Sequence, residues 1–315
     1  MEKIRIGISA CLLGRNVRYD GGHRHDRHLT DTLGRWFDWV PVCPEVEYGL
    51  PVPREAMRLV GDPGNPRLFT IRTHIDHTDG MLAWAKKRLT ELAGEGLSGF
   101  VFKSRSPSSG MAAVKVYGRN GRAVKRGTGI FAGAFMRRFP LLPVEEEDRL
   151  SDPLLRENFV ERIFVYRRWT DLEKRGGTAK EISNFHADHG LLILSHSPKH
   201  MAALNRLVAD PGRQDLRALR DEYPRLLMEA LRLPATVPKQ TRVLSRVTGH
   251  LQKRLSPNER QELVDAIERY RQGLLPLLIP VTLIEHYARL YNDPYLKSQV
   301  YLHPHPLERM LRNHG

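Results

Sequence analysis

Short apolar runs alternate with one amphipathic segment in the first half of the chain. Residues 3–9 alternate apolar and polar positions, and residues 39–42 and 99–102 are short apolar runs, so all three segments predict strands. The segment 79–92 predicts a helix, because its apolar residues keep a spacing of three and four: Met81, Leu82, Trp84, Ala85, Leu89 and Leu92. Strand, helix and strand in this order are typical of a parallel crossover unit. We therefore predict an α/β fold with a mostly parallel sheet and flanking helices.

Beyond residue 150 the pattern becomes helical almost throughout. An acidic run at 145–149 precedes Ser151-Asp152-Pro153, which has the cap and the early proline of a helix start. Helical periodicity then continues over residues 154–174, 180–194, 199–208, 214–231, 237–255, 257–273 and 281–291. We predict an α/β domain over residues 1–150 and an all-α domain over residues 151–315.

Candidate chemistry follows the predicted strands. Cys11 and Cys43 each come after a strand, and a serine-rich segment, 103–110, comes after a third. In an open parallel sheet the carboxyl ends of the strands converge on one crevice, where ligands bind. Two thiols and a serine are therefore expected to face one site. The chain has only 2 cysteines, which favours reduced thiols over a disulfide scaffold.

The charge balance points to a polyanionic partner. Lys+Arg number 50 and Asp+Glu 36, a formal net charge of +14. Such an excess favours salt-dependent binding to nucleic acid, although a basic surface can also simply serve solubility. No apolar run approaches the roughly 20 residues that span a bilayer, and the first residues lead into a strand and not into a signal peptide. We expect a cytoplasmic protein without a membrane partner, and no protein partner is evident.

Several spaced motifs resemble known families. The first half resembles the thiouracil desulfidase (TudS) family over about residues 3–150, through SACLLG at 9–14, VRYDG at 17–21, PVCPEV at 41–46, GL at 49–50, PR at 53–54 and SPSSG at 106–110. The second half resembles the helical YbgA-like domain, through residues 185–189, 196–200 and 301–306. Fusions of the two are similar to the RudS-type desulfidases, which remove sulfur from 4-thiouridine in tRNA.

The resemblance implies a 4Fe-4S cluster held by three cysteine thiolates, with one iron open to the sulfur of a thiocarbonyl. Thiolates are the soft ligands that iron and sulfur prefer, and an open metal site acts as a Lewis acid. The net reaction would be hydrolysis, giving uridine and sulfide. Here Cys11 and Cys43 match two ligands, but Ser109 occupies the third position, and its hydroxyl is a hard ligand with a high pKa.

Two interpretations of Ser109 stay open. The chain is either an altered form of an active enzyme or a natural homologue that has lost the cluster, and the intact surrounding motifs favour the first. Under both interpretations we predict that the chain holds no stable intact cluster and has little activity.

Other site roles are predicted around these ligands. Glu45 is the best candidate for a general acid or base, because it lies two residues after Cys43. Ser104 and Ser106 are candidates for positioning water or the pyrimidine, and Ser9 and Asp20 for orienting the loop around Cys11. Each of these residues has an alternative role in a turn or a cap, and the cysteines could be buried structural thiols.

The second half offers contacts to RNA. His186 and His189 stand three apart on a predicted helix, which allows a zinc site or hydrogen-bonded structural and RNA-facing roles. Lys199 and Arg206 are predicted to contact phosphates. Our leading hypothesis is a tRNA 4-thiouridine desulfidase that extrudes its target base from the stack. The alternatives are a desulfidase of free thiouracil or its nucleoside, and a cluster-free protein that binds tRNA without catalysis.

Overall fold

A computed structural model of the chain describes residues 3–118, 121–209 and 215–312. The chain divides into two compact units, Met1–Phe159 and Val160–Gly315. Residue 214, the predicted start of one helix, lies outside the described residues. Among the described residues, no helix has the length and apolar content needed to cross a membrane.

The first unit contains a four-stranded parallel sheet in the order β2-β1-β5-β8. Its strands are β1 (Ile4–Ser9), β2 (Phe37–Val42), β5 (Phe100–Phe102) and β8 (Val144–Glu146). Ser9 at the end of β1 lies opposite Val42 at the end of β2, so Cys11 and Cys43 follow neighbouring strand ends. The predicted fold class is confirmed.

A second sheet, which the sequence pattern did not predict, consists of two hairpins in the order β4-β3-β6-β7. Its strands are β3 (Met57–Asp62), β4 (Asn65–Thr70), β6 (Val114–Tyr117) and β7 (Ala123–Gly127). Each hairpin is antiparallel, and β3 pairs with β6 in parallel. The buried side chains of this sheet pack against Met81 and Ile130, and they include Leu59, Leu68, Val114 and Val116.

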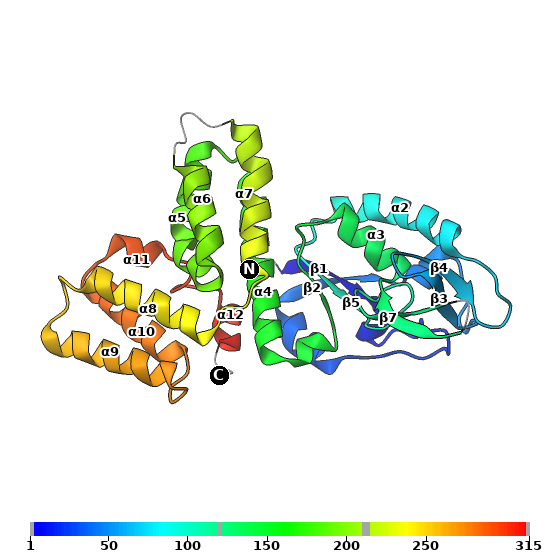
Figure 1. Ribbon diagram of the computed structural model, residues 1–315, viewed down its shortest axis with the longest axis horizontal. Helices are drawn as coiled ribbons and strands as arrows, with labels where there is room; N and C mark the ends of the chain where they lie inside the picture. The colour runs from blue at the N-terminus through cyan, green and yellow to red at the C-terminus, as the bar shows by residue number, and fades with distance from the viewer. Residues whose placement is uncertain (1–2, 119–120, 210–214, 313–315) are drawn as a thin grey trace. The chain divides into compact units, whose positions relative to one another are not determined.

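The helices of this unit are α1 (Pro44–Tyr48), α2 (Thr78–Gly94) and α3 (Ile130–Arg138), and α2 and α3 lie beside each other (Figure 1). Phe100 and Phe102 of β5 stack with ring centroids 4.3 Å apart, and Phe135 of α3 lies 4.7 Å from Phe100. Aromatic packing therefore fixes α3 against the strand that leads into the serine-rich segment.

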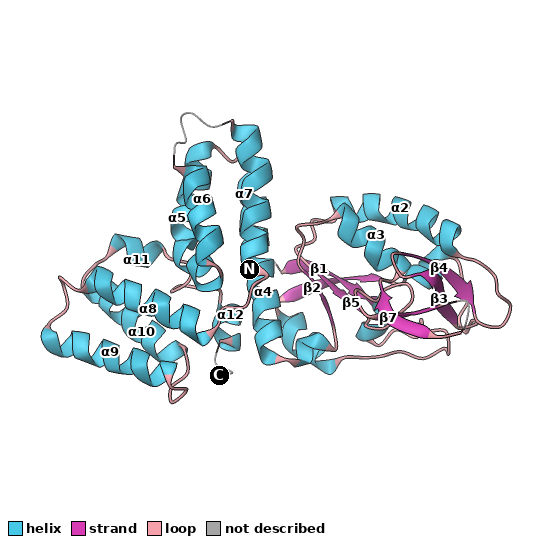
Figure 2. Cartoon of the chain, viewed as in Figure 1, coloured by secondary structure: helices cyan, strands magenta, loops and turns pink. Residues whose placement is uncertain are grey.

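The second unit is helical, as predicted, and its described residues contain helices and loops but no strand (Figure 2). α4 (Pro153–Lys174) runs across the boundary between the units, and α5 (Ala179–His196) packs against α6, α7 and α8. The remaining helices are α6 (Pro198–Val208), α7 (Leu216–Leu231), α8 (Val237–Leu251), α9 (Pro257–Arg271), α10 (Leu278–Leu290), α11 (Pro294–Ser298) and α12 (Pro306–Leu311). α8 ends four residues earlier than the sequence pattern predicts, at Leu251 and not at 255.

Candidate active site

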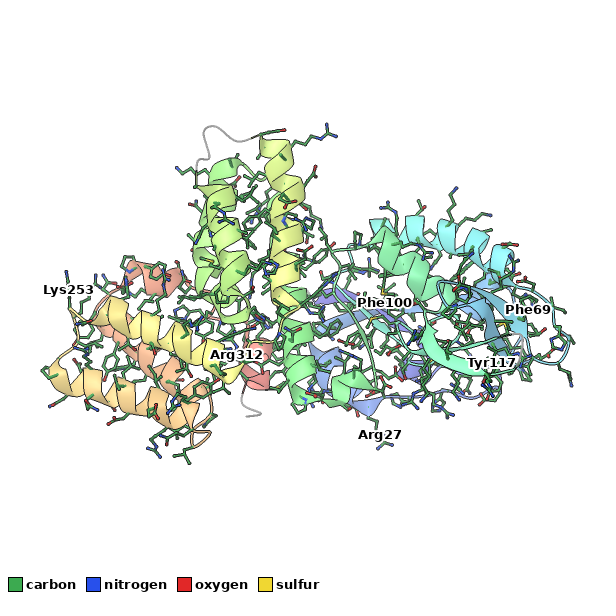
Figure 3. All side chains as sticks on the ribbon, viewed as in Figure 1. Arg27, Phe69, Phe100, Tyr117, Lys253 and Arg312 are labelled. Carbon is green, nitrogen blue, oxygen red and sulfur yellow. The ribbon has the colours of Figure 1, made fainter. Side chains whose placement is uncertain are left out.

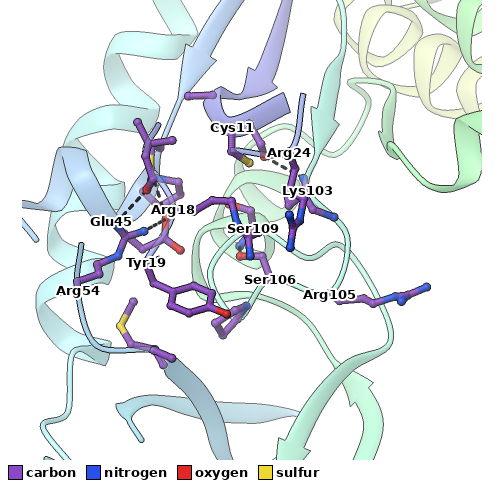
Figure 4. A pocket seen from close by; sticks show the side chains of 18 of the residues that line it. Cys11, Arg18, Tyr19, Arg24, Glu45, Arg54, Lys103, Arg105, Ser106 and Ser109 are labelled. Carbon is purple, nitrogen blue, oxygen red and sulfur yellow. Dashed lines mark hydrogen bonds and ion pairs between the residues drawn. The ribbon is translucent and has the colours of Figure 1, made fainter. Parts of the chain in front are cut away.

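A cavity of about 430 Å³ lies where β1, β2 and β5 end at their carboxyl termini. Cys11, Cys43 and Ser109 all line it, together with Glu45 and Ser106. Figure 4 shows Cys11, Glu45, Ser106 and Ser109 around this cavity. The three positions that the sequence assigns to a cofactor thus meet in one cavity, because parallel strands deliver their carboxyl ends to one edge of the sheet.

The two thiols are nearly buried, each 9% exposed. Burial raises the pKa of Cys11 to about 11, and nearby Lys103 opposes this rise only in part. Burial, followed by the negative charge of Glu45, raises the pKa of Cys43 to about 12. The Cys43 Sγ lies 3.6 Å from Glu45 Oε2. In the absence of a metal, both side chains are therefore protonated at neutral pH.

A chain of hydroxyl groups connects the serine-rich segment to Glu45. The Ser108 hydroxyl donates to Glu45 Oε1 at 2.5 Å, and the Ser106 and Ser108 hydroxyls are 3.0 Å apart. Ser106 Oγ also accepts from the Ser109 backbone N–H at 3.1 Å. Ser108, fully buried, was not among the predicted site residues, although it stands inside the SPSSG motif that could have indicated it.

The start of α3 holds this serine loop in place. The Phe131 N–H donates to the Ser108 carbonyl at 2.9 Å, and the Ile130 N–H donates to the Pro107 carbonyl at 3.1 Å. These bonds satisfy N–H groups that the first turn of a helix leaves without intrahelical partners. A Cβ at Gly129 would lie 2.5 Å from the Ser108 carbonyl carbon and oxygen, so only glycine allows this approach.

The acidic run anchors the same loop from the other side. Glu147 accepts from the Ser104 N–H at 2.6 Å, from the Ser104 hydroxyl at 2.9 Å and from the Lys103 ammonium. Glu146 accepts from the Met111 N–H at 2.7 Å. Sequence reasoning used this run only as the mark of a domain boundary and missed its place beside the site. Because the Ser104 hydroxyl is engaged by Glu147, Ser104 stabilises the loop in this structure.

The other two predicted residues near Cys11 hold backbone in place. Ser9 Oγ accepts from the Lys103 N–H at 2.9 Å and so ties the end of β1 to the end of β5. Asp20 accepts from the Gly22 N–H at 3.1 Å and pairs with Arg18 at 3.4 Å, and both contacts lower the pKa of Asp20. Asp20 does not itself line the cavity, whereas Ser9 does.

Positive charge is distributed unevenly around the cavity. Inside, Arg54 Nη2 lies 3.8 Å from Glu45 Oε2, and Lys103 is paired with Glu147. At the rim, Arg105 is 84% exposed and lies 3.6 Å from the exposed Asp148. Arg24, also exposed, forms no ion pair within the described part of the chain. Figure 4 shows Arg105 extending away from the cavity. The interior is thus close to neutral, while the rim offers positive charge to an anion.

Comparisons with known proteins match both halves of the chain. Residues 6–147 match the model of the 2-thiouracil desulfurase family, and residues 191–306 match a family described as a protein of unknown function, DUF1722. The uncharacterized protein YbgA of Escherichia coli strain K12 is 33% identical over 155 residues, which are 49% of this chain and 92% of that protein. The chain belongs to the YbgA family and carries a 2-thiouracil desulfurase domain.

A solved structure is also similar to part of the chain. It is described as the [4Fe-4S]-dependent thiouracil desulfidase TudS, with 32% sequence identity and a TM-score of 0.39. The match covers 47% of this chain and 94% of that structure.

The donor set of the desulfurase domain does not fit a cluster that requires three thiolates. Cys11 and Cys43 supply two sulfur atoms, and Ser109 supplies a hydroxyl that is a poor ligand for iron. Within the described residues, no group of three or more His, Cys, Asp or Glu side chains is arranged to hold a metal ion.

The four site residues predicted in the helical domain differ in burial: two are histidines inside the unit and two are exposed cations. His186 contacts the Tyr223 hydroxyl at 3.3 Å and Asn205 at 2.8 Å, and His189 Nδ1 contacts the Phe185 carbonyl at 2.7 Å. Burial lowers the pKa of His189 to about 3, so this histidine is a neutral packing residue. The other two predicted residues, Lys199 and Arg206, are exposed on α6.

Proposed function

We propose that this protein has the fold and site of a cytoplasmic desulfidase that removes sulfur from 4-thiouridine in tRNA. We further propose that Ser109, in the place of a third cysteine, makes the turnover of this chain slow. The observation that carries the proposal is the single cavity lined by Cys11, Cys43, Glu45 and Ser109 in a domain of the 2-thiouracil desulfurase family. In the proposed reaction the thiocarbonyl carbon gains an oxygen atom from water and the sulfur leaves as sulfide. This net hydrolysis requires no electron donor.

Glu45 is the proposed general base or acid. Its carboxylate is fixed by the Ser108 hydroxyl at 2.5 Å and lies beside Cys43, so it can take a proton from a water molecule in the cavity. The Arg54 guanidinium lies 3.8 Å from Glu45 Oε2 on the other side of this carboxylate. Ser106, which lines the cavity, is proposed to orient that water or the pyrimidine ring.

Charge at the rim supports RNA as the substrate. A thiolated base is uncharged and suits the balanced interior, whereas the adjoining phosphates suit Arg24 and Arg105. A base in tRNA must leave its stack to enter the cavity. Free thiouracil, the competing substrate, has no phosphate and would make no use of these two exposed cations.

Ser109 itself favours one alternative from another class. With a hydroxyl in place of the third thiol, the protein could bind thiolated tRNA without converting it. The two functions differ in a measurable way, because only the first is recovered when a sulfur ligand is restored.

The test compares the native chain with Ser109→Cys after anaerobic reconstitution with iron and sulfide. Iron content is measured for both proteins, and loss of the 4-thiouridine absorbance of tRNA is followed together with sulfide release. Ser108→Cys is a matched control, since it also adds one thiol to the serine loop but at a fully buried position that does not line the cavity.

We expect only Ser109→Cys to retain about four irons per chain and to desulfurise tRNA. If the native chain retains as much iron and turns over as fast, the proposed effect of Ser109 is wrong. If neither protein turns over while both bind tRNA, the protein is a tRNA-binding protein and the proposed catalysis fails. If the protein converts only free thiouracil, its substrate is the small molecule and not tRNA.

A further inference from the structure

The charged residues of α8 are all basic. Its 15 residues include Lys239, Arg242 and Arg246 but neither Asp nor Glu. The neighbouring α9, also 15 residues long, mixes both signs, with carboxylates at Glu259, Glu262, Asp265 and Glu268. Because the two helices pack against each other, their location in the unit does not explain the difference in charge.

Two arginines and a histidine of α8 form one exposed stripe, whereas Lys239 is half-buried and donates to the His196 and Pro234 carbonyls. Arg242, Arg246 and His250 follow one another at intervals of four residues, and Lys253 continues the row just beyond the helix. All four side chains are exposed. At 1.5 Å per residue, the three members within the helix lie about 6 Å apart along its axis. Figure 3 shows Lys253 extending away from the helices.

Much of this charge is not neutralised by the protein. Within the described part of the chain, Arg242, Arg246 and Lys253 form neither an ion pair nor a side-chain hydrogen bond. His250, by contrast, lies 2.9 Å from Asp293. A row of exposed cations without carboxylate partners along a helix is the electrostatic footprint of nucleic-acid binding.

A groove of about 320 Å³ lies beside the stripe, between α8 and α9, and α9 contributes Arg260, Val264, Ile267 and Glu268 to its lining. On the α8 side it is lined by hydroxyl and amide groups and by one glycine: Thr241, Ser245, Thr248, Gly249 and Gln252. A Cβ at Gly249 would meet no atom within 4 Å, so packing does not explain why the helix has glycine there. Glycine in a helix weakens it and allows a ligand backbone to approach closely. Hydroxyl and amide groups beside cations are the usual contacts to a sugar-phosphate backbone.

The buried face of α8 argues against a lipid partner. A basic helix that binds a membrane inserts its apolar side into the lipid. In α8 that side is already inside the protein, with Val243, Leu244, Val247 and Leu251 almost fully buried. Apart from Val237 at its first position, the exposed side of α8 offers charge and hydrogen-bond donors without large apolar side chains, which suits a hydrated phosphate backbone.

We infer that the exposed face of α8, formed by Arg242, Ser245, Arg246, Gly249 and Lys253, docks the sugar-phosphate backbone of RNA. The identity of the RNA as tRNA rests on the proposed function. Docking at this face is separate from the chemistry, since none of these residues lines the desulfurase cavity. Predicted phosphate contacts at Lys199 and Arg206 belong to a different helix, α6.

The test measures binding of a fluorescent tRNA transcript without thiouridine to the full native chain, by anisotropy over a series of salt concentrations. Arg242→Ala/Arg246→Ala is compared with Arg269→Ala/Arg271→Ala on α9, which removes the same charge from the adjacent helix. Gly249→Glu is compared with Gly249→Gln, which has the same shape without the charge. Circular dichroism verifies that each variant is folded.

The α8 pair should bind at least tenfold more weakly, and the slope of log affinity against log salt should fall by about 1 for each phosphate that the variant no longer neutralises. The α9 pair should keep the native slope, and Gly249→Glu should bind more weakly than Gly249→Gln. Equal losses of affinity in the α8 and α9 pairs would overturn the inference. It would also be overturned if polyglutamate or anionic vesicles displaced the labelled tRNA as well as unlabelled tRNA does.

The two proposals can fail independently. If Ser109→Cys desulfurises free thiouracil and the native chain binds no tRNA, the inference about α8 fails and the chemistry stands. If the α8 pair alone loses tRNA binding and Ser109→Cys is inactive, the chemistry fails and the docking face stands.

Discussion

The desulfurase cavity and the exposed face of α8 are both rich in basic residues, but they use them in opposite ways. In the cavity, Lys103 is paired with Glu147 and Arg54 with Glu45. On α8, Arg242 and Arg246 are free of carboxylate partners among the described residues. Paired charges hold side chains in fixed positions, whereas free charges remain available to a polyanion.

This difference suits two different tasks. The proposed reaction at a thiocarbonyl requires Glu45 and the serine loop to be placed to within a fraction of an ångström, and the paired cations there hold these groups in position. A docking face must attract a flexible polymer from a distance, which exposed charges without a close partner do best. Removing a cation or its partner should therefore affect stability in the cavity and binding on α8.

Within the desulfurase cavity, the largest effect on stability is expected for Glu147→Gln. This change removes the carboxylate that accepts bonds from Lys103 and Ser104, and it leaves the partly buried ammonium of Lys103 without its partner. We expect the free energy of opening of the serine loop to fall by roughly 2–4 kcal/mol. Hydrogen exchange of peptides that cover β5 and residues 103–112 measures it.

Asp79→Asn is the control for this prediction. Its ion pair with Arg67 is 2.9 Å long, but the side chains of Asp79 and Arg67 are 80% and 49% exposed. The loss of this pair should therefore lower the free energy of unfolding by only about 0–1 kcal/mol. A similar loss in both variants would show that pairing inside the cavity has no special structural role.

The next effect is expected for Gly129→Ala, which tests how tightly α3 holds the serine loop. The added methyl group would lie 2.5 Å from the Ser108 carbonyl and must push the loop away from the helix. Overpacking of this kind costs about 1–3 kcal/mol, and the displaced Ser108 would release Glu45. Thermal unfolding measures the loss, and faster reaction of Cys11 and Cys43 with a thiol reagent reports the opened cavity.

Gly94→Ala provides the matched control. Gly94 lies in the last turn of α2, where a Cβ would meet no atom within 4 Å. Alanine should therefore stabilise this helix by up to about 1 kcal/mol. The prediction fails if both alanine substitutions change stability in the same direction.

Local patterns were sufficient to predict the parallel sheet and the convergence of its strand ends. The end of β1 and all of β5 stand out in the sequence because they are buried on both faces, and β2 stands out by its short apolar run; Cys11 and Cys43 follow shortly after β1 and β2. The second sheet was missed, because β7 is exposed at four of its five positions and shows no apolar run. Short, half-exposed strands are defined by their pairing partners more than by their own residues.

The residues that complete the site were harder to predict for a similar reason. Glu147 contacts Lys103 across 44 positions of sequence, and Ser108 contacts Glu45 across 63. No spacing rule links positions so far apart, so their contacts depend on the finished fold. The basic residues of α8 can be seen in the sequence. Their exposure and their lack of carboxylate partners cannot, because both depend on which residues the fold brings near them.

A third prediction concerns buried charge in the helical domain. His189 is held neutral because burial, and then the nearby Arg168 and His186, lower its pKa to about 3. The unfolded chain takes up a proton near pH 6.5, whereas the folded protein does not, so stability must fall as the pH drops below 6.5. Between pH 7.5 and pH 5 the loss from His189 is about 2 kcal/mol.

Hydrogen exchange of peptides from α5, compared at these two pH values after correction for the intrinsic exchange rate, measures this loss. The range stays above the titration of most carboxylates, so the Glu161 pair, which loses stability at lower pH, contributes little. His189→Leu removes the titrating group and should flatten the dependence, leaving the smaller contributions of His186 and His305 and the opposing one of Glu308, whose pKa is raised by burial. An unchanged pH dependence in this variant would contradict the assignment.

The smallest effect on stability is expected for Arg242→Ala/Arg246→Ala. These side chains are exposed and unpaired among the described residues, so truncating them should change the free energy of unfolding by no more than about 0.5 kcal/mol. Arg312→Ala is the matched contrast in the same unit, because this buried arginine lies 3.2 Å from Glu161 and its loss should cost roughly 3–5 kcal/mol. Urea unfolding monitored by circular dichroism compares the variants. A large loss of stability in the α8 pair would mean that its cations serve the fold, and the contrast between paired and available charge would then no longer hold.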